Sequence, residues 1–323
     1  VIPNGGTSPY TYLWSSGAST DSITGRLAGT YFVTITDAKL CTKIDTIQIF
    51  EPNLLIASIN TKTPVSCFGG NDGTATASVS GGSPAYSFAW NGGGAAISKN
   101  NLSQGNHIIT VTDSKGCSDT ALVIISQPAK LAVSLIDTNP TKCFGNANGE
   151  AIVAVSGGNY PFAYNWMPSS SQTDSSVNTL SAGIHRVIVT DIKACKDTLN
   201  GIVINQPDSI SIAFIKSDVA CFASASGKAK VLPTGGTNPY TYLWSNGSTA
   251  DSITNLSIGN YSVTVRDRNL CQKIGSISIS QPTILASSKS SDSVTCYGLA
   301  NGKAKVIPNG GTSPYTYLWS SGA

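Results

Sequence analysis

The stretch that decides the fold reads CFGGNDGTATASVSGGSPAYSFAW and covers residues 67–90. A turn rich in Gly, Asn and Asp opens it, an alternating run follows, and a Gly-Gly pair then turns the chain into a second alternating run. Strict alternation with a period of two is the pattern of β-strands. The residues on one face are Ala75, Ala77 and Val79 in the first run and Tyr86, Phe88 and Trp90 in the second.

The same pattern recurs along the whole chain. Its opening Cys-aromatic pair begins at Cys67, Cys143, Cys221 and Cys296, at steps of about 76 residues. Residues 1–18 reappear letter for letter as residues 306–323, which is 305 positions later. Four units of about 76 residues therefore make one block of 305, and we expect the natural protein to extend beyond this chain.

Each unit continues with a strong alternating strand that runs from a Gly to an Asp, then a second Cys, then a last strand that ends at Glu-Pro or Gln-Pro. About seven short strands per unit, with turn signals every 8–12 residues, predict an all-β immunoglobulin-like β-sandwich. The dipeptide is the predicted boundary, and short Pro linkers favour an extended rod or filament. The predicted repeats are 1–52 (N-terminal part missing), 53–128, 129–207, 208–282 and 283–323 (C-terminal part missing).

Composition excludes several classes of protein. Charged residues make up 11% of the chain and only two are Glu, which argues against exposed helices. No run of about 18 apolar residues predicts a membrane span. A net charge of +3 without a basic cluster gives no nucleic-acid footprint.

Three segments of one unit carry a family resemblance. They are Cys-Phe-Gly-Gly-Asn-Asp-Gly at 67–73, Ser80-Gly81-Gly82 through Trp90, and Val111-Thr112-Asp113 through Cys117. Together they resemble the SprB-type repeat of very long surface adhesins in gliding Bacteroidota, and the closing half also resembles PKD-type Ig-like domains. The resemblance implies type IX secretion, a cell-surface or extracellular location and an adhesive or filament role in gliding motility. It implies no catalytic residue and no cofactor. One unit departs from the motif, with Ser224-Ala225-Ser226-Gly227 at the turn.

The cysteines predict disulfides. There are eight of them, two per unit, with no Cys-x-x-Cys and no nearby His, so a zinc site is not expected. Regular pairs in an exported protein are typical of disulfide bonds, and buried free thiols are the alternative.

Three disulfide connectivities compete. Pairing within a unit, Cys67 with Cys117, needs cysteines at opposite ends of a sandwich, about 25 Å apart, to approach within about 7 Å. Pairing across the linker, Cys117 with Cys143, needs the last and first strands to form a hairpin, and the near-constant spacing of these cysteines supports it. The third pattern, which we call skipping, pairs cysteines of neighbouring units. It joins the turn after the first strand (the A–B turn) of one unit to the turn before the last strand (the F–G turn) of the next unit. We favour skipping: Cys67–Cys195 and Cys143–Cys271, with Cys41, Cys117, Cys221 and Cys296 paired outside this chain.

Other residues suggest chemistry, but each has a structural explanation. The aromatic stripe could stack sugars, although a Trp on the third strand is typical of a sandwich core. His107 and His185 occupy the position of Tyr31 and Tyr261 in sister units, which indicates structural replacement. The carboxylate that ends the long strand could bind Ca²⁺ at a domain junction, but an Asx turn is the simpler reading. It recurs as Asp37, Asp113, Asp191 and Asp267, and Asn71 and Asp72 add to the Ca²⁺ case in one unit.

A modification pattern also recurs. Bacteroidota of the resembled kind attach O-glycans at Asp-Ser or Asp-Thr followed by a small or aliphatic residue, and this chain holds more such sites than its composition leads one to expect. The candidate residues are Ser22, Thr46, Thr120, Thr198, Ser209, Ser252 and Ser293.

The sequence therefore predicts a non-enzymatic stalk or filament of a long extracellular adhesin, glycosylated at several sites. Its predicted partners are neighbouring repeats of the same chain and laterally associated rods, with no nucleic acid. The alternative is an adhesion module in which turns around Phe68–Asp72 or Ser15–Thr20 bind glycans or other cells. In such a module the differences between units would gather in one cluster of loops, whereas here they are scattered.

Overall fold

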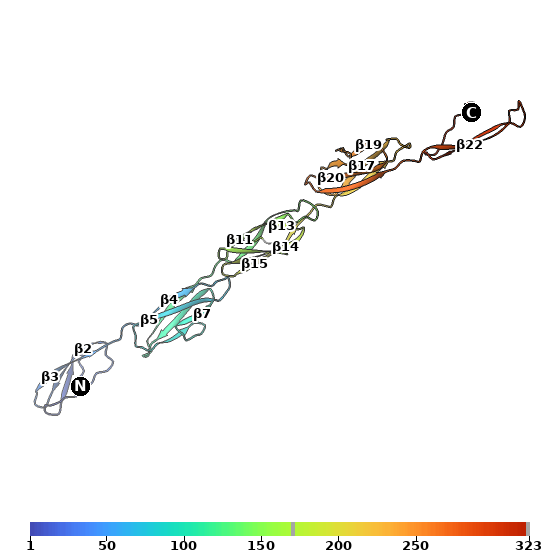
Figure 1. The fold of residues 1–323 in the computed structure, drawn as a ribbon. Coiled ribbons are helices and arrows are strands. Elements are labelled where there is room, and N and C mark those ends of the chain that lie inside the picture. The colour runs from blue at the N-terminus through green and yellow to red at the C-terminus, as the bar shows by residue number, and fades with distance from the viewer. Residues whose placement is uncertain (169–171, 321–323) are drawn as a thin grey trace. The chain divides into compact units, whose positions relative to one another are not determined.

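The computed structural model describes residues 1–168 and 172–320. These residues form antiparallel β-sheets and no helix (Figure 1). In this described part of the chain, no helix has the length and hydropathy of a membrane span. The chain divides into two compact units, Val1–Lys130 and Leu131–Ala323.

The first unit holds an incomplete sandwich and a complete one. The incomplete sandwich is the sheet β1-β2-β3, built from Thr11–Trp14, Gly29–Thr36 and Thr42–Ile49. The complete one pairs sheet β4-β5-β7 with sheet β6-β8-β9. Its strands are β4 (Ile56–Thr63), β5 (Gly73–Ser80), β6 (Ser87–Trp90), β7 (Ser98–Leu102), β8 (Gly105–Thr112) and β9 (Ser118–Ile125).

The second unit repeats this arrangement twice and begins a third sandwich. Sheets β10-β11-β13 and β12-β14-β15 form one sandwich, sheets β16-β17-β19 and β18-β20-β21 form the next, and β22 pairs with β23. The strands are β10 (Ala132–Asn139), β11 (Gly149–Ser156), β12 (Phe162–Met167), β13 (Ser176–Leu180), β14 (Gly183–Asp191), β15 (Lys196–Ile204), β16 (Ser211–Ser217), β17 (Gly227–Thr234), β18 (Thr241–Trp244), β19 (Ser252–Leu256), β20 (Gly259–Arg266), β21 (Gln272–Ile279), β22 (Ala286–Asp292) and β23 (Lys303–Asn309).

In the described residues each complete sandwich has six strands in two three-stranded sheets, which confirms the all-β immunoglobulin-like fold with one strand fewer than the expected number of about seven. The difference lies in the variable polar stretch between the third strand and the long strand. This stretch contributes one strand, such as β13 or β19, and the buried apolar residues of that strand lie three positions apart, Val177 and Leu180 in β13. The 283–323 segment forms the β22-β23 hairpin, and its last three residues lie outside the described part.

The core lies between the two sheets and is made by the alternating residues. In the 129–207 sandwich, Trp166 of β12 lies opposite Val187 of β14, and both are fully buried. Val189, two positions further along β14, is also buried, whereas Ile188 between them faces outward. Burying one large apolar side chain stabilises a fold by about 1.5–3 kcal/mol, so these positions dominate the stability of each sandwich.

The first and last strands of a sandwich lie side by side and run parallel. In the 129–207 sandwich, the Val133 amide donates to Asp197 Oδ2 (2.8 Å) at one end of β10, and the Thr141 amide donates to the Asn205 carbonyl (2.9 Å) beyond its other end. Both pairs span 64 residues, so the two strands advance in step. The chain therefore enters a sandwich at one end and leaves it at the other.

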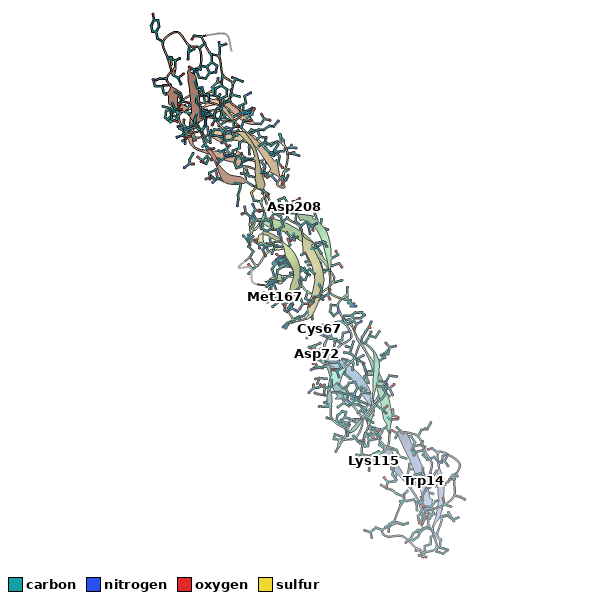
Figure 2. All side chains as sticks on the ribbon, turned by 90° about the vertical axis from the view of Figure 1, so that its right-hand side faces the viewer. Trp14, Cys67, Asp72, Lys115, Met167 and Asp208 are labelled. Atoms are coloured by element: carbon teal, nitrogen blue, oxygen red, sulfur yellow. A yellow bond between two sulfur atoms is a disulfide. The ribbon has the colours of Figure 1, made fainter. Side chains whose placement is uncertain are left out.

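The two cysteine-bearing turns accordingly lie at opposite ends of a sandwich. In the 53–128 repeat, Cys67 and Asp72 mark the A–B turn at one end, and Lys115 marks the F–G turn at the other (Figure 2). This placement agrees with the topology on which the sequence-based pairing argument depends.

Candidate functional site

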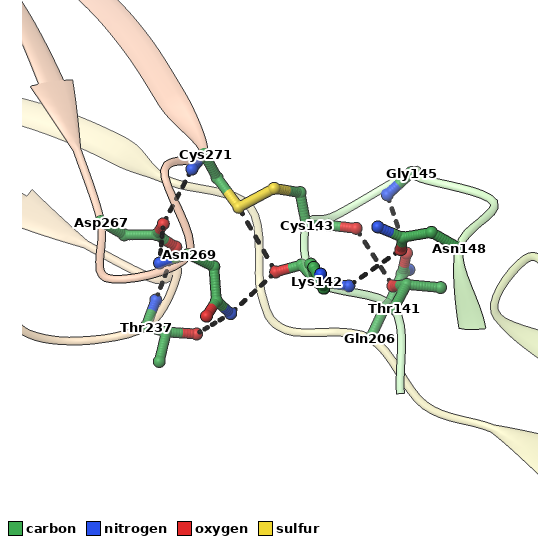
Figure 3. Close-up of a disulfide and its surroundings, with 10 residues drawn as sticks. All are labelled: Thr141, Lys142, Cys143, Gly145, Asn148, Gln206, Thr237, Asp267, Asn269 and Cys271. Carbon is green, nitrogen blue, oxygen red and sulfur yellow. Dashed lines mark hydrogen bonds between the residues drawn. A yellow bond between two sulfur atoms is a disulfide. The ribbon is translucent and has the colours of Figure 1, made fainter. Parts of the chain in front are cut away.

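The candidate site is the junction between the 129–207 and 208–282 sandwiches, where two turns are joined covalently (Figure 3). Cys143 lies in the A–B turn after β10, and Cys271 lies in the F–G turn before β21. A disulfide joins them with their Cα atoms 5.6 Å apart and closes a sequence separation of 128 residues. This pair is one of the two that the sequence analysis favours.

A buried carboxylate holds the F–G turn in shape. Asp267 Oδ1 accepts hydrogen bonds from the amides of Asn269 and Cys271, both at 2.9 Å, so this side chain directly positions the cysteine backbone. Its Oδ2 accepts from the amide of Thr237, which follows the Gly-Gly turn, at 2.9 Å. The close approach requires glycine, because a Cβ on Gly236, whose φ is +63°, would lie 2.8 Å from Oδ2.

The same arrangement recurs in the other units, and it identifies these carboxylates as Asx-turn acceptors. Backbone N–H groups, first that of Thr7 and of Ser83 respectively, hold the pKa of Asp37 and of Asp113 below the usual value. Burial raises the pKa of Asp191, but hydrogen bonds from Asn159, Cys195 and Lys193 outweigh it and lower the pKa.

The hydrogen bonds of these carboxylates do not favour Ca²⁺ binding. Both oxygens of Asp191 already accept N–H groups, from the amides of Lys193, Cys195 and Asn159, and an oxygen occupied by N–H donors is poorly placed to bind a cation. In the described residues, no three His, Cys, Asp or Glu side chains gather in a way that could hold a metal ion. Asp72, the additional candidate, accepts the amide of Ser66.

Two side chains hold the A–B turn. The Lys142 amide donates to Asn148 Oδ1 (3.0 Å), and the Gly145 amide donates to Gln206 Oε1 (2.9 Å). Gln206 belongs to the Gln-Pro dipeptide, which the sequence indicates only as a domain boundary. Its side chain thus links the end of the sandwich to the turn that carries Cys143. This role is missed by sequence reasoning, although the recurrence of the dipeptide is a signal for it.

The sister turns use the same two bonds. Gln127 accepts from Gly69, and Gln281 accepts from Ala223. At the position of Asn148 the acceptors are Asp72, Ser226 and Asn301. The departure from the motif at residues 224–227 therefore keeps the turn, because the Ser226 hydroxyl accepts where an amide or carboxylate oxygen does elsewhere.

Polar contacts surround the disulfide. Asn269 Nδ2 donates to the Lys142 carbonyl (3.0 Å), and Cys271 Sγ lies 3.3 Å from the same oxygen. A cavity of about 240 Å³ opens beside the bond, lined in part by Phe144, Pro207 and Lys273. Its lining mixes apolar and charged groups and holds no cluster of reactive side chains.

The remaining cysteines fall into two groups. Cys41, Cys117, Cys221 and Cys296 are exposed and free, and their pairing outside this chain stays a prediction. The strands β15 and β16, which flank Pro207, belong to different sheets, so they form no hairpin of the kind that pairing across the linker requires. The Cys67–Cys195 pair would join the two units and stays a prediction.

The aromatic and histidine candidates have structural roles. The indoles of the first four units, Trp14, Trp90, Trp166 and Trp244, are buried and donate Nε1–H to a backbone carbonyl, as Trp166 does to Asp174 (3.0 Å). His185 Nε2 lies 2.8 Å from the Ser181 carbonyl, and Tyr261 donates its hydroxyl to Ser257 at the same spacing of four residues. His107 pairs with Ser103 in the same way. The histidines therefore replace tyrosines, as the sequence analysis infers.

The candidate glycosylation residues are all accessible. Their side chains lie on strands or linkers at exposed positions: Ser22, Thr46, Thr120, Thr198, Ser209, Ser252 and Ser293. The preceding Asp has its own structural role at Asp119 and Asp197, whose carboxylates accept the amides of Ala57 and Val133. Part of this pattern therefore reflects how the last strand holds the first.

The fold and the site define a tandem immunoglobulin-like repeat protein in which a disulfide between two turns joins the 129–207 and 208–282 sandwiches. A sequence profile described as SprB repeat matches this chain four times, at residues 59–95, 135–171, 213–249 and 288–323. Each match covers the A–B turn and the aromatic run of one unit, and the chain thus contains four SprB repeats. No curated protein matches its sequence.

Solved structures of tandem domains resemble it at low identity. Sidekick-1 immunoglobulin domains 1–5 give a TM-score of 0.27 at 12% identity over 84% of this chain and 74% of that chain. The extracellular domains 3–5 of Drosophila OTK give 0.22 at 9% identity over 69% of this chain and 92% of that chain. PcdhgB3 EC1–4 gives 0.28 at 10% identity over 79% and 82%.

Proposed function

We propose that this chain is part of a non-enzymatic stalk or filament of a long extracellular bacterial surface adhesin. One observation carries the proposal: the Asp, Gln and His side chains that could otherwise perform chemistry are used to hold turns and the junction. The Asp carboxylates, the Gln amides and the His rings all accept or share hydrogen bonds with backbone groups. The SprB repeats and the tandem sandwich fold support an adhesin-type repeat protein.

The chemistry of the junction supports an extracellular location. Disulfides persist in oxidising compartments, and the Cys143–Cys271 bond joins two half-buried cysteines at a turn–turn contact that water can reach. Export by the type IX route, a role in gliding and an origin in Bacteroidota belong to this proposal through the SprB resemblance. Short Pro linkers would give the repeats an extended rod.

The surface location and the lack of glycan binding can be tested directly. In the native cell, antibodies against the 53–128 repeat should label intact cells, and external protease should remove the signal. Purified chain should show no saturable binding to arrayed glycans. Signal confined to permeabilised cells would contradict the stalk, and saturable glycan binding would favour the adhesion module instead.

The disulfide pattern of the proposed filament is Cys67–Cys195 in addition to Cys143–Cys271, with the exposed free cysteines bonded to repeats outside this chain. The recurrence of the A–B and F–G turns supports it, since each turn is held by the same hydrogen bonds. A peptide map without reductant should yield the Cys67–Cys195 peptide pair. A Cys67–Cys117 pair would contradict this pattern.

The second candidate function, an adhesion module or a laterally associating filament, is favoured by one observation. The aromatic residue after each A–B cysteine is exposed at the tip of its turn, with exposed fractions of 53% at Phe68, 57% at Phe144 and 48% at Phe222. Exposed aromatic side chains can stack on sugars or on a neighbouring filament. Replacing Phe68 and Phe144 with Ser should leave filament length unchanged and abolish any such binding.

We also propose O-glycans on the exposed Asp-Ser and Asp-Thr residues. Their accessibility supports the idea, and low charge makes added sugars useful for solubility. Glycopeptide analysis of the native protein should find hexose-containing peptides at Ser22, Thr46 and Thr198. Unmodified peptides at all three would contradict the proposal.

A further inference from the structure

A single sandwich of this fold would be sheared by tension along the chain. The chain enters the 129–207 sandwich along β10 and leaves it along β15, and these strands are parallel neighbours tied at both ends. Pulling on the backbone would draw the start of β10 and the end of β15 in opposite directions. With no other covalent connection, tension would therefore slide the two strands past each other and unfold the sandwich.

The disulfide creates a much shorter covalent route through the same two sandwiches. From Leu131 the route follows the chain along β10 to Cys143, crosses the sulfur–sulfur bond, and follows β21 from Cys271 to Pro282. The chain between the two cysteines, residues 144–270, forms a closed loop beside this route. That loop contains most of both hydrophobic cores, including Trp166 and Trp244.

We propose that this bond diverts tension away from both sandwiches. Only β10 of one sandwich and β21 of the next then lie on the force path, and each is held at both of its own ends. A strand held in this way is stretched along its axis, and no neighbour is pulled in the opposite direction. The inference rests on the proposed stalk function, because only a protein under tension needs such a route.

The turns at the two ends of the bond are built to pass this tension. Cys143 follows closely after Thr141, whose amide closes the end of β10, and the turn is held further by Asn148 and Gln206. Cys271 directly precedes β21 and is fixed by Asp267. Tension therefore passes from strand to turn to bond to strand with little chain to straighten.

The route can continue in the same form. Beyond Pro282 the chain enters β22, and Cys296 follows that strand as Cys143 follows β10. At each further bond of the proposed pattern, the force path would again pass from the first strand of one sandwich to the last strand of the following sandwich. The filament would then lengthen very little under force, although each sandwich by itself could be unfolded by tension.

The test is to stretch the complete chain in an optical trap with handles at Lys130 and Thr283, attached through non-canonical azide residues so that no cysteine is added. At about 3.5 Å per extended residue, the distance between the handles in the oxidised chain should not exceed about 90 Å. Adding dithiothreitol to the same molecule should release a further extension of about 440 Å, the length of the closed loop.

Matched variants separate the bond from other effects. Cys143→Ser with Cys271→Ser should release the full length without reductant, whereas Cys221→Ser should behave as the unmodified chain. Extension of the oxidised chain in steps of about 250 Å, the length of one sandwich, would overturn the proposal. A peptide map that lacks the Cys143–Cys271 pair would overturn it as well. Neither result bears on the surface location tested by antibody labelling, so failure of the force path and failure of the stalk are distinguishable.

Discussion

At the scale of single residues, the Asp that ends the long strand holds several backbone amides at once. Asp191 is buried and accepts the amides of Lys193, Cys195 and Asn159. Asp191→Ala leaves these donors without a partner, and we expect a loss of about 2–4 kcal/mol in the free energy of unfolding, measured by urea denaturation. Asp208→Ala, at an exposed linker position, is the control and should change it by less than about 0.5 kcal/mol. Equal losses in the two variants would contradict this role.

The same carboxylates predict acid sensitivity. The folded-state pKa values of Asp113 and Asp191 lie below the unfolded value of about 3.9, and that of Asp218 falls to about 2 because the Ser280 amide and Lys216 bind its carboxylate. On acidification the unfolded chain therefore takes up protons first. The stabilisation is complete above about pH 5 and is lost as the pH falls toward 2. The urea midpoint should be flat from pH 7 to 5 and then decline, and a midpoint that rises below pH 4 would contradict the assignment.

His185 offers a test of structural replacement. Its Nε2 shares a hydrogen bond with the Ser181 carbonyl, but its Nδ1 is buried without a partner. His185→Tyr restores the residue found in sister units and should leave stability within about 1 kcal/mol of the original, whereas His185→Ala should cost about 2–3 kcal/mol. Thermal unfolding followed by Trp fluorescence measures both. A Tyr variant as unstable as the Ala variant would show that the histidine has another role.

At the scale of turns and strands, the Gln of the Gln-Pro dipeptide positions a cysteine. Gln206→Ala removes the acceptor for the Gly145 amide, and we expect it to slow formation of the Cys143–Cys271 bond several-fold during refolding with oxidised glutathione. Gln281→Ala removes the same bond from the turn at Ala223 and is the matched control. Both variants should lose about 1 kcal/mol of stability, but only the first should delay this disulfide, as followed by timed peptide mapping. Equal rates would contradict the positioning role.

Most of the strand positions are predictable from the alternation of apolar and polar residues. The runs around Ala77 and Trp90 are strands because small and aromatic residues alternate there, and the structure places them as expected. The number of strands is less predictable, because the polar stretch before Leu102 has little apolar periodicity and contributes only β7. The side-chain role of Gln206 also escapes the sequence, since its partner lies 61 residues away and only the folded chain brings them together.

At the scale of the whole molecule, the disulfide should govern resistance to unfolding. Closing a separation of 128 residues removes chain entropy from the unfolded state, which corresponds to a stabilisation of up to about 4–5 kcal/mol in the loop-entropy description. Reduction should therefore lower the melting temperature of the second unit clearly, and Cys143→Ser should reproduce the effect without reductant. Cys221→Ser should not. Calorimetry of the three proteins measures the shift, and an unchanged melting temperature after reduction would contradict it.

The repeat arithmetic makes the architecture predictable at this scale, but not the pairing of its cysteines. The near-equal sequence steps between Cys67, Cys143, Cys221 and Cys296 show that one structural unit is repeated in tandem. The bond between Cys143 and Cys271 depends on which turn of one sandwich meets which turn of the next, and the residues that fix this contact, such as Asn269 against Lys142, have no recognisable motif. For that reason the sequence leaves several connectivities open.

The reach of this bond has a consequence for how the protein matures. Synthesis from the amino terminus produces Cys143 first, and its partner follows 128 residues later, in a turn that exists only once the following sandwich has folded. Formation of the bond at one junction therefore depends on correct folding of the next repeat. A misfolded repeat would leave an unpaired thiol one repeat upstream.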